Sequence, residues 1–162
     1  MNNKTININF QQIAKGSQLH DEDLLLLESA LLATETSYAP YSNFFVGAAI
    51  RLENLMEIIV GSNQENASYP CGICAERTAI HQANIRYPKY IISAMAVVVK
   101  NETKHVPSPC GFCRQVMSEQ EIRNKNPIKL ILGHPNRECY IFQSCSALLP
   151  FAFQPEHLNS IL

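Results

Sequence analysis

The spacing of apolar residues predicts alternating helices and strands along most of the chain. Leu24, Leu27 and Leu31 recur at helical spacing, and Pro40 limits the helix that they predict. Strand-like apolar runs follow at 45–52, 57–61, 90–100, 128–132 and 139–142, and helical patterns at 74–86, 111–121 and 146–158. Strands that alternate with helices favour a three-layer α/β/α domain.

Two of these patterns predict how the layers pack. Met95–Val99 is a continuous apolar run, which is typical of a strand covered on both faces. Ala75, Ala79 and Ala83 repeat every four residues, so one helix face is narrow enough to pack closely. Residues 1–17 are polar and are predicted to form a flexible N-terminal segment, which leaves 18–162 as a single domain.

The composition argues against nucleic acids and membranes as partners. Of the 162 residues 17% are charged and the net charge is −1, so no basic excess is present to bind a nucleic-acid backbone. We find no apolar signal sequence and no apolar run long enough to span a membrane. Six cysteines in such a chain indicate a reducing, cytoplasmic location, with Cys139 and Cys145 expected to be small buried residues. The low charge also hints at extra buried area, as in an oligomer.

The other four cysteines form two closely spaced pairs. Cys71 and Cys74 are followed 36 residues later by Cys110 and Cys113. Thiolates at this spacing suit a tetrahedral zinc ion. Four sulfur ligands would close the coordination shell and make a structural site, whereas three would leave one position for water. Redox-active thiols are a third interpretation.

Glu76 favours the catalytic interpretation of these cysteines. If the helices that begin at Cys74 and after Cys110 point their N-termini at each other, Cys74, Cys110 and Cys113 converge on one ion. Glu76 then lies on the same opening turn as Cys74, where it can exchange protons with a water molecule on the metal. Arg77 would draw negative charge away from the sulfurs. Spacing alone leaves the structural alternative open.

Beyond these pairs, five segments together resemble the small, homotetrameric, zinc-dependent cytidine deaminases of the cytidine/deoxycytidylate deaminase superfamily. The matching segments are Tyr41–Ala49, Gly61–Pro70, Cys74–Ala79, Ser108–Val116 and Leu148–Glu156. No single segment is decisive, but their order and joint presence are specific. The resemblance implies a five-stranded mixed sheet between helices and one zinc ion per subunit, held by Cys74, Cys110 and Cys113.

The resemblance also implies an activity. It is the hydrolytic deamination of cytidine and deoxycytidine to uridine and deoxyuridine with release of ammonia, a hydrolase reaction of pyrimidine salvage. Glu76 would accept the proton of the attacking water and pass protons to the ring nitrogen and the leaving amine. Arg77 would compensate the charge of the zinc thiolates.

Five further residues are implied to bind the nucleoside. Asn63 and Glu65 would hold the ribose hydroxyls, Phe44 would face the pyrimidine ring, and the backbone of Ala75 would meet the edge of that ring. Phe153 would complete the site of a neighbouring subunit. Cys71, Phe45 and Phe112 depart from the family's pattern, since that family usually has a non-ligand residue at the first position and smaller residues at the other two.

Three alternative functions remain. A blasticidin-type deaminase uses similar cysteine motifs, but Asn63–Pro70 and Phe153–Glu156 favour a nucleoside enzyme. A non-catalytic module with a closed four-sulfur zinc site would be structural. An enzyme that edits polynucleotides is disfavoured by the weak basic content.

Overall fold

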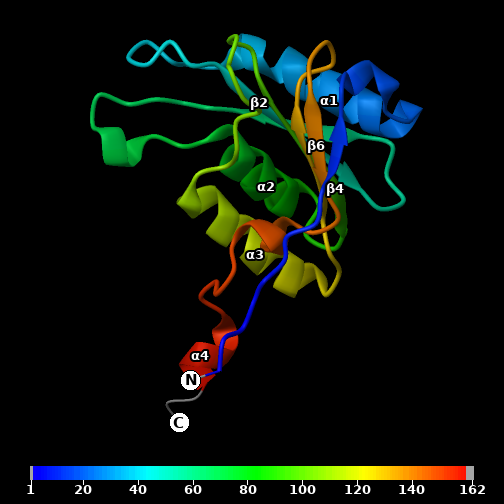
Figure 1. The fold of residues 1–162 in the computed structure, drawn as a ribbon. Helices are drawn as coiled ribbons and strands as arrows, with labels where there is room; N and C mark the ends of the chain where they lie inside the picture. Colours follow the sequence, from blue (N-terminus) through cyan, green and yellow to red (C-terminus); the bar gives the residue numbers. More distant parts are fainter. Residues whose placement is uncertain (1, 160–162) are drawn as a thin grey trace.

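The computed structural model describes residues 2–159 and is built on one six-stranded sheet (Figure 1). Its strands lie in the order β1-β6-β5-β4-β2-β3. The strands are β1 (Gln11–Ile13), β2 (Val46–Leu52), β3 (Ile58–Ser62), β4 (Ile92–Val99), β5 (Lys129–Gly133) and β6 (Cys139–Phe142). The α-helices are α1 (Asp21–Ala33), α2 (Ala75–Arg86), α3 (Gly111–Asn124) and α4 (Pro155–Asn159). Short 3-10 helices are η1 (Gly16–Gln18), η2 (Thr34–Thr36), η3 (Tyr69–Cys71) and η4 (Cys145–Leu148).

The sheet is mixed, as the resemblance implied. β4 and β5 are parallel, with Ala96 paired to Ile131, and α3 lies in the crossover between them. Every other neighbouring pair of strands in this sheet is antiparallel. No helix among residues 2–159 is long and apolar enough to cross a lipid bilayer.

The prediction of five strands was wrong, because β1 adds a sixth strand at the edge of the sheet. Gln11–Ile13 pairs with β6, and the Phe10 ring lies 5.0 Å from the ring of Tyr140 and 5.4 Å from that of Phe142. Three residues with two adjacent glutamines carry too little alternation to predict a strand from sequence. Only the exposed edge of β6 supplies the hydrogen-bonding partner. The predicted boundaries 1–17 and 18–162 include residues 1 and 160–162, which lie outside the described residues.

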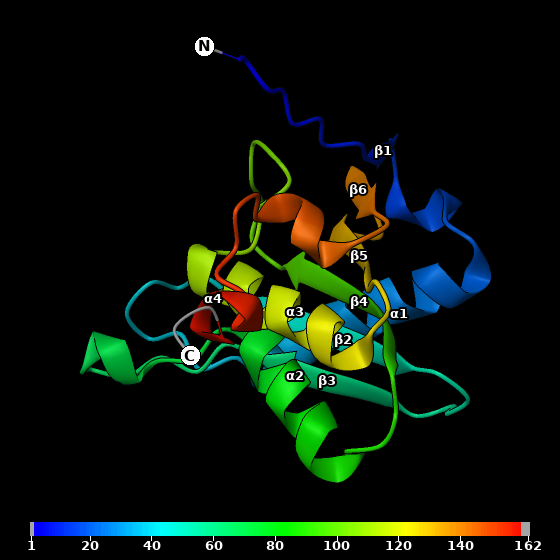
Figure 2. The same cartoon turned by 90° about the horizontal axis from the view of Figure 1, so that it is seen from below.

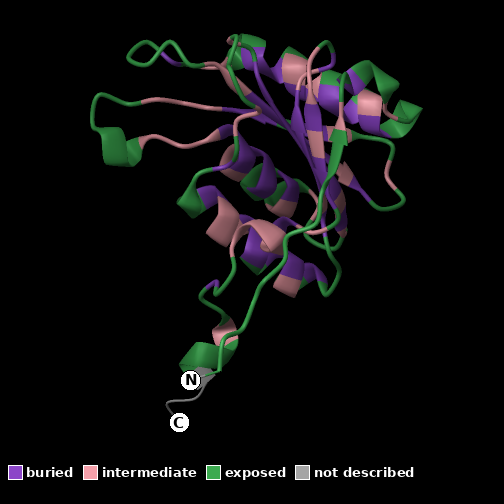
Figure 3. Ribbon diagram, in the orientation of Figure 1, coloured by how far each residue is buried: buried purple, intermediate pink, exposed green. Residues whose placement is uncertain are grey.

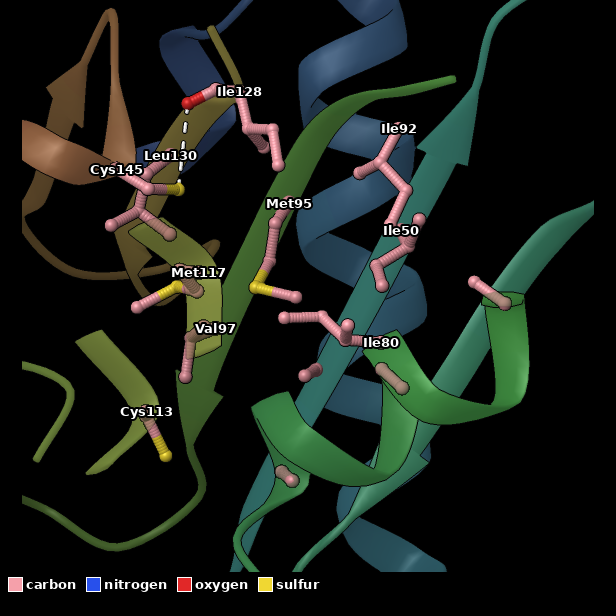
Figure 4. Packing of buried hydrophobic residues seen from close by; sticks show 14 of the residues in the cluster. Ile50, Ile80, Ile92, Met95, Val97, Cys113, Met117, Ile128, Leu130 and Cys145 are labelled. Atoms are coloured by element: carbon pink, nitrogen blue, oxygen red, sulfur yellow. Dashed lines mark hydrogen bonds between the residues drawn. The ribbon is translucent and has the colours of Figure 1, made fainter. Parts of the chain in front are cut away.

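Helices cover the sheet on both faces, which confirms the predicted three layers. On one face, α1 packs through Leu26, Leu27 and Ala30 against alternate residues of β2 and β4. On the opposite face, α2 and α3 pack around Met95 and Met117, and Figure 4 shows these two side chains between the helices and the strands. Strands β2 to β6 and the inner helix faces are mostly buried, whereas the edge strand β1 is mostly exposed, as Figure 3 shows. This double coverage explains the continuous apolar run in β4.

A close approach between β3 and α2 fixes where α2 begins. The alanines at 75, 79 and 83 are all buried, as their spacing predicted. A Cβ atom on Gly61 would lie 2.5 Å from the Ala79 nitrogen and 2.7 Å from the Ala75 oxygen. Both are backbone atoms of α2, so any side chain at position 61 would push the helix away from the sheet. The absence of a side chain at Gly61 therefore lets the first turns of α2 pack directly against β3.

Gly61→Ala is expected to destabilise the protein by about 1–3 kcal/mol, the usual cost of overpacking a buried contact. Because the shift affects the first turn of α2, zinc content after purification should also fall. Urea unfolding and metal analysis measure the two effects. Gly111→Ala is the matched control for unfolding, since a Cβ at Gly111 meets no atom within 4 Å. Equal unfolding midpoints for the two variants would contradict this account of Gly61.

Candidate metal and nucleoside site

Three cysteine sulfurs converge where α2 and α3 begin. Cys74 is the N-cap of α2, Cys110 is the N-cap of α3, and Cys113 lies in the first turn of α3. The Sγ of Cys110 lies 4.0 Å from that of Cys74 and 3.5 Å from that of Cys113. Among residues 2–159 this is the one group of three or more cysteine, histidine or acidic side chains close enough to share a metal ion, with all three sulfurs within 4.8 Å of one another.

Hydrogen bonds and charge make this cluster suited to a cation. A hydrogen bond from Cys113, helped by Cys110 and Arg77, lowers the pKa of Cys74 to about 5 although burial opposes the shift. The pKa of Cys113 is raised, because its thiol proton is held by Cys74 and because it is buried. Three sulfurs this close together can exchange their protons for a metal ion, since a metal binds thiols in their deprotonated form.

Arg77 lies beside the sulfurs, where the sequence placed it. Its Nη2 donates to the Gly72 carbonyl at 3.2 Å, and its charge is among the causes that lower the pKa of Cys74. Its Nε is buried with no hydrogen-bond partner among the described residues. Three convergent sulfurs and an adjacent, partly buried guanidinium whose buried Nε donor is unused fit a zinc ion held by thiolates, because a zinc–thiolate group is negative overall.

Cys71 does not belong to the cluster. It is exposed at the end of η3, and the group of convergent sulfurs contains only the other three. A closed four-sulfur site therefore finds no support in this arrangement. Cys139 and Cys145 are fully buried in the core, as predicted.

Glu76 is the one buried carboxylate next to the sulfurs among the described residues. It lies in the first turn of α2, is 5% exposed, and lines a cavity together with Cys74 and Cys110. Burial raises the pKa of Glu76, and the negative charge on Cys74 acts in the same direction. A carboxyl group with a raised pKa binds a proton more tightly than an exposed one, which suits a group that must accept a proton and then return it.

The cavity beside Glu76 has a volume of about 550 Å³, enough for a small organic molecule, and we call it the site cavity. The sequence predicted six residues of its wall: Phe44, Asn63, Glu65, Cys74, Glu76 and Cys110. It missed the others: Ser42, Val46, Val97, Val99, Pro107, Ser108 and Pro109. A second hollow of about 800 Å³ shares Ser42, Asn63, Glu65 and Cys74 with the site cavity, so the two adjoin.

Asn63 and Glu65 also hold the backbone that carries Phe44. Asn63 Nδ2 donates to the Phe44 carbonyl at 2.9 Å, and its Oδ1 accepts from the Val46 nitrogen at 2.9 Å. Glu65 accepts from the Tyr41 nitrogen at 2.9 Å and from the Ser42 hydroxyl. The Ser42 hydroxyl, followed by the Tyr41 N–H, lowers the pKa of Glu65. Both side chains are therefore fixed at the cavity wall before any ligand arrives.

Asn101 secures the same segment and was not singled out as a site residue. Its Oδ1 accepts from the Phe45 nitrogen at 2.9 Å, and its Nδ2 donates to the Asn43 carbonyl at 2.8 Å. Asn43 has the left-handed φ of 53°, a conformation that asparagine tolerates better than most residues. The two contacts join residues 56 and 58 positions apart in sequence, so no local pattern could have predicted them.

Two of the residues predicted to bind the nucleoside, Ala75 and Phe153, lie outside the wall of the site cavity. Ala75 is fully buried at the start of α2. Phe153 is 58% exposed in the C-terminal tail and lines neither hollow. Phe112, which departs from the family's pattern, is 78% exposed and borders the larger hollow, with its ring centroid 6.0 Å from the Arg77 guanidinium.

Comparison with known proteins agrees with this geometry. The family model described as the cytidine and deoxycytidylate deaminase zinc-binding region matches residues 20–126. A cytidine deaminase of Halalkalibacterium halodurans is 39% identical over 135 residues, which are 83% of this chain and 96% of that protein. A cytidine deaminase of Sporosarcina psychrophila is 42% identical over 140 residues, 86% of this chain and 96% of that one.

Solved structures give the same result for the fold. The crystal structure of cytidine deaminase from Burkholderia pseudomallei matches with a TM-score of 0.69 and 39% identity, over 83% of this chain and all 100% of that one. That of the Mycobacterium tuberculosis cytidine deaminase matches with a TM-score of 0.64 and 30% identity, over 83% and 98% of the two chains. By sequence, by fold and by the residues around its three cysteines, the chain belongs to the cytidine and deoxycytidylate deaminase family.

Proposed function

We propose that the protein is a zinc-dependent hydrolase that converts cytidine and deoxycytidine to uridine and deoxyuridine and releases ammonia. The observation that carries this proposal is the position of Glu76. This carboxyl group is buried in the wall of a cavity that Cys74 and Cys110 also line. A structural zinc site has no need of such a group or of a cavity beside it.

Cys74, Cys110 and Cys113 would hold one zinc ion per subunit. When bound, zinc lowers the pKa of a water molecule and so supplies a nucleophile at neutral pH. Glu76 accepts the proton of the attacking water and delivers it to the ring nitrogen adjacent to carbon 4. The oxygen of that water would bond to carbon 4, and its second proton would go to the exocyclic amine. The bond from carbon 4 to the amine nitrogen would then break, and ammonia would leave. Arg77 keeps the thiolates from becoming too electron-rich.

The fixed residues of the cavity wall suit a nucleoside. Phe44, in the cavity wall, offers an aromatic face to the pyrimidine ring. The resemblance implies that the backbone of Ala75, between the wall residues Cys74 and Glu76, meets the polar edge of that ring. Asn63 and Glu65 present oxygen and nitrogen atoms to the ribose hydroxyls, using the hydrogen-bonding capacity left over from their contacts with the backbone. Contacts directed at hydroxyl groups, one of them from the Glu65 carboxylate, which would repel a phosphate, favour a nucleoside over a polynucleotide.

Phe153 supports an oligomer in which neighbouring subunits complete each other's sites. It is exposed and lies outside both hollows of its own chain, so a contact with substrate requires a second copy. We propose a homotetramer, the state implied by the resemblance. A cytoplasmic location and a role in pyrimidine salvage agree with six free cysteines and a small nucleoside substrate.

Zinc analysis combined with the loss of cytidine absorbance tests this function most directly. The purified protein should contain about one zinc ion per chain and should convert cytidine and deoxycytidine in proportion to that content. Blasticidin and single-stranded oligonucleotides serve as competing substrates and should react far more slowly. Zinc-loaded protein that leaves cytidine unchanged would favour a structural zinc module, and faster turnover of blasticidin would favour that alternative enzyme.

A further inference from the structure

Arg114, in the first turn of α3, bridges two segments that are far apart in sequence. Its Nε donates to the Pro109 carbonyl at 2.7 Å, and its Nη2 donates to the Ser108 hydroxyl at 2.9 Å. Both partners lie in Ser108–Cys110, which we call the metal loop. Its Nη1 donates to the Leu148 carbonyl at 2.9 Å, at the end of η4. One planar guanidinium thus contacts the metal loop and the last residue of η4 together.

Leu148 begins the segment that carries Phe153. We call Leu148–Phe153 the tail. Gln115, the residue after Arg114, donates from its Nε2 to the Phe153 carbonyl at 2.8 Å. Within the tail, Phe151 has a φ of 61°, a left-handed conformation that is costly for a phenylalanine. Such a conformation persists only where surrounding contacts determine it, so the tail is held rather than free.

The start of η4 is held separately by Glu121. This carboxylate lies seven residues after Arg114 in α3. It accepts from the Cys145 nitrogen at 2.8 Å and from the Ser144 hydroxyl at 2.8 Å. Figure 2 shows η4 beside α3, with the chain continuing from it to α4. Arg114 and Gln115 therefore secure the far end of a segment whose beginning is already fixed. Of these contacts, only those of Arg114 also reach the metal loop.

We propose that Arg114 is a positioning residue that couples the metal site to the tail. The proposal rests on the zinc site of the proposed function. A metal ion that fixes Cys110 orders the metal loop. The ordered loop then holds the Arg114 guanidinium in the orientation in which it also donates to the Leu148 carbonyl. Because coupling is reciprocal, a held tail also favours the metal-bound loop. The rigid fork of an arginine serves three acceptors in different directions, which a lysine ammonium on a flexible stem does not reproduce.

A tryptophan reporter in the tail tests the coupling. The chain contains no tryptophan, and Phe151 is 93% exposed, so Phe151→Trp places a single fluorophore there. Its anisotropy is measured on the zinc-loaded full chain and again after chelation, with circular dichroism as the check of folding. We expect chelation to lower the anisotropy when Arg114 is present. Adding Arg114→Met should lower the zinc-loaded value and abolish the response to chelation.

Two further variants separate coupling from loss of charge. Arg123→Met removes the same charge from an exposed position on the same helix and should keep the zinc-dependent change. Arg114→Lys retains the charge, but its anisotropy should no longer respond to chelation. The proposal would be overturned if chelation left the anisotropy of the reporter unchanged in the parent. It would also be overturned if chelation lowered the anisotropy of Arg114→Met or Arg114→Lys as much as that of the parent.

If Arg114→Met does not fold, Gln115→Leu and Arg114→Lys keep the proposal testable. Gln115→Leu releases only the tail, so it should lower the anisotropy while zinc content stays at the parent level. If both zinc-loaded variants showed the same anisotropy as the parent, the result would count against the coupling. No substrate is used in these measurements, so a protein that fails to deaminate cytidine can still show the coupling.

Discussion

Replacing Glu76 with glutamine is expected to lower kcat for cytidine by roughly 10²–10⁴-fold, the usual contribution of a general acid–base group. Glutamine has nearly the same shape as glutamate but can neither take a proton from water nor return one to the substrate. The side chain is 5% exposed, so the substitution keeps the wall of the site cavity filled. Initial rates from the fall in cytidine absorbance measure the effect.

Zinc content and unfolding midpoint are the controls for Glu76→Gln. Both should stay close to those of the parent, because the carboxyl group is not one of the three convergent sulfur ligands. Removing a carboxylate that burial penalises should leave stability unchanged or slightly higher. Turnover near the parent rate in a fully zinc-loaded variant would disprove the role of Glu76.

Replacing Cys110 or Cys71 with alanine should have opposite effects on zinc content. Cys110→Ala removes one of three convergent sulfurs, so zinc content should fall from about one ion per chain to almost none, and activity should disappear with it. Cys71→Ala changes an exposed residue outside the cluster and should retain the metal. Metal analysis after dialysis against a weak chelator compares the two variants under identical conditions.

This pair of variants also decides between the open and the closed zinc site. Four sulfur ligands predict that both substitutions release zinc, whereas three predict that only Cys110→Ala does. Circular dichroism should show a folded protein in the Cys71→Ala case, because that residue ends an exposed 3-10 helix. Loss of zinc from Cys71→Ala would return the site to the structural interpretation.

Local patterns were sufficient for most of the secondary structure. The apolar run that became β4 and the alanine repeat of α2 have the periods of a strand and a helix, and those periods arise within a few residues of chain. The three-residue β1 has no such pattern and depends on the open edge of β6. The same distinction applies at the site, where motif spacing located the cysteines and Glu76 but not Asn101 or Arg114.

The sequence by itself determined the chemical groups of this protein: two cysteine pairs, a carboxylate two residues after Cys74, and the periodicities that place them at helix N-termini. Only the tertiary structure decided which sulfurs meet, since Cys71 and Cys74 are three residues apart yet only Cys74 joins Cys110 and Cys113. It also decided that Asn101 and Arg114 hold the walls of the site, through partners up to 58 residues away. Spacing along the chain fixes which groups can share one turn of a helix, whereas packing of helices against the sheet fixes which distant groups come within bonding distance.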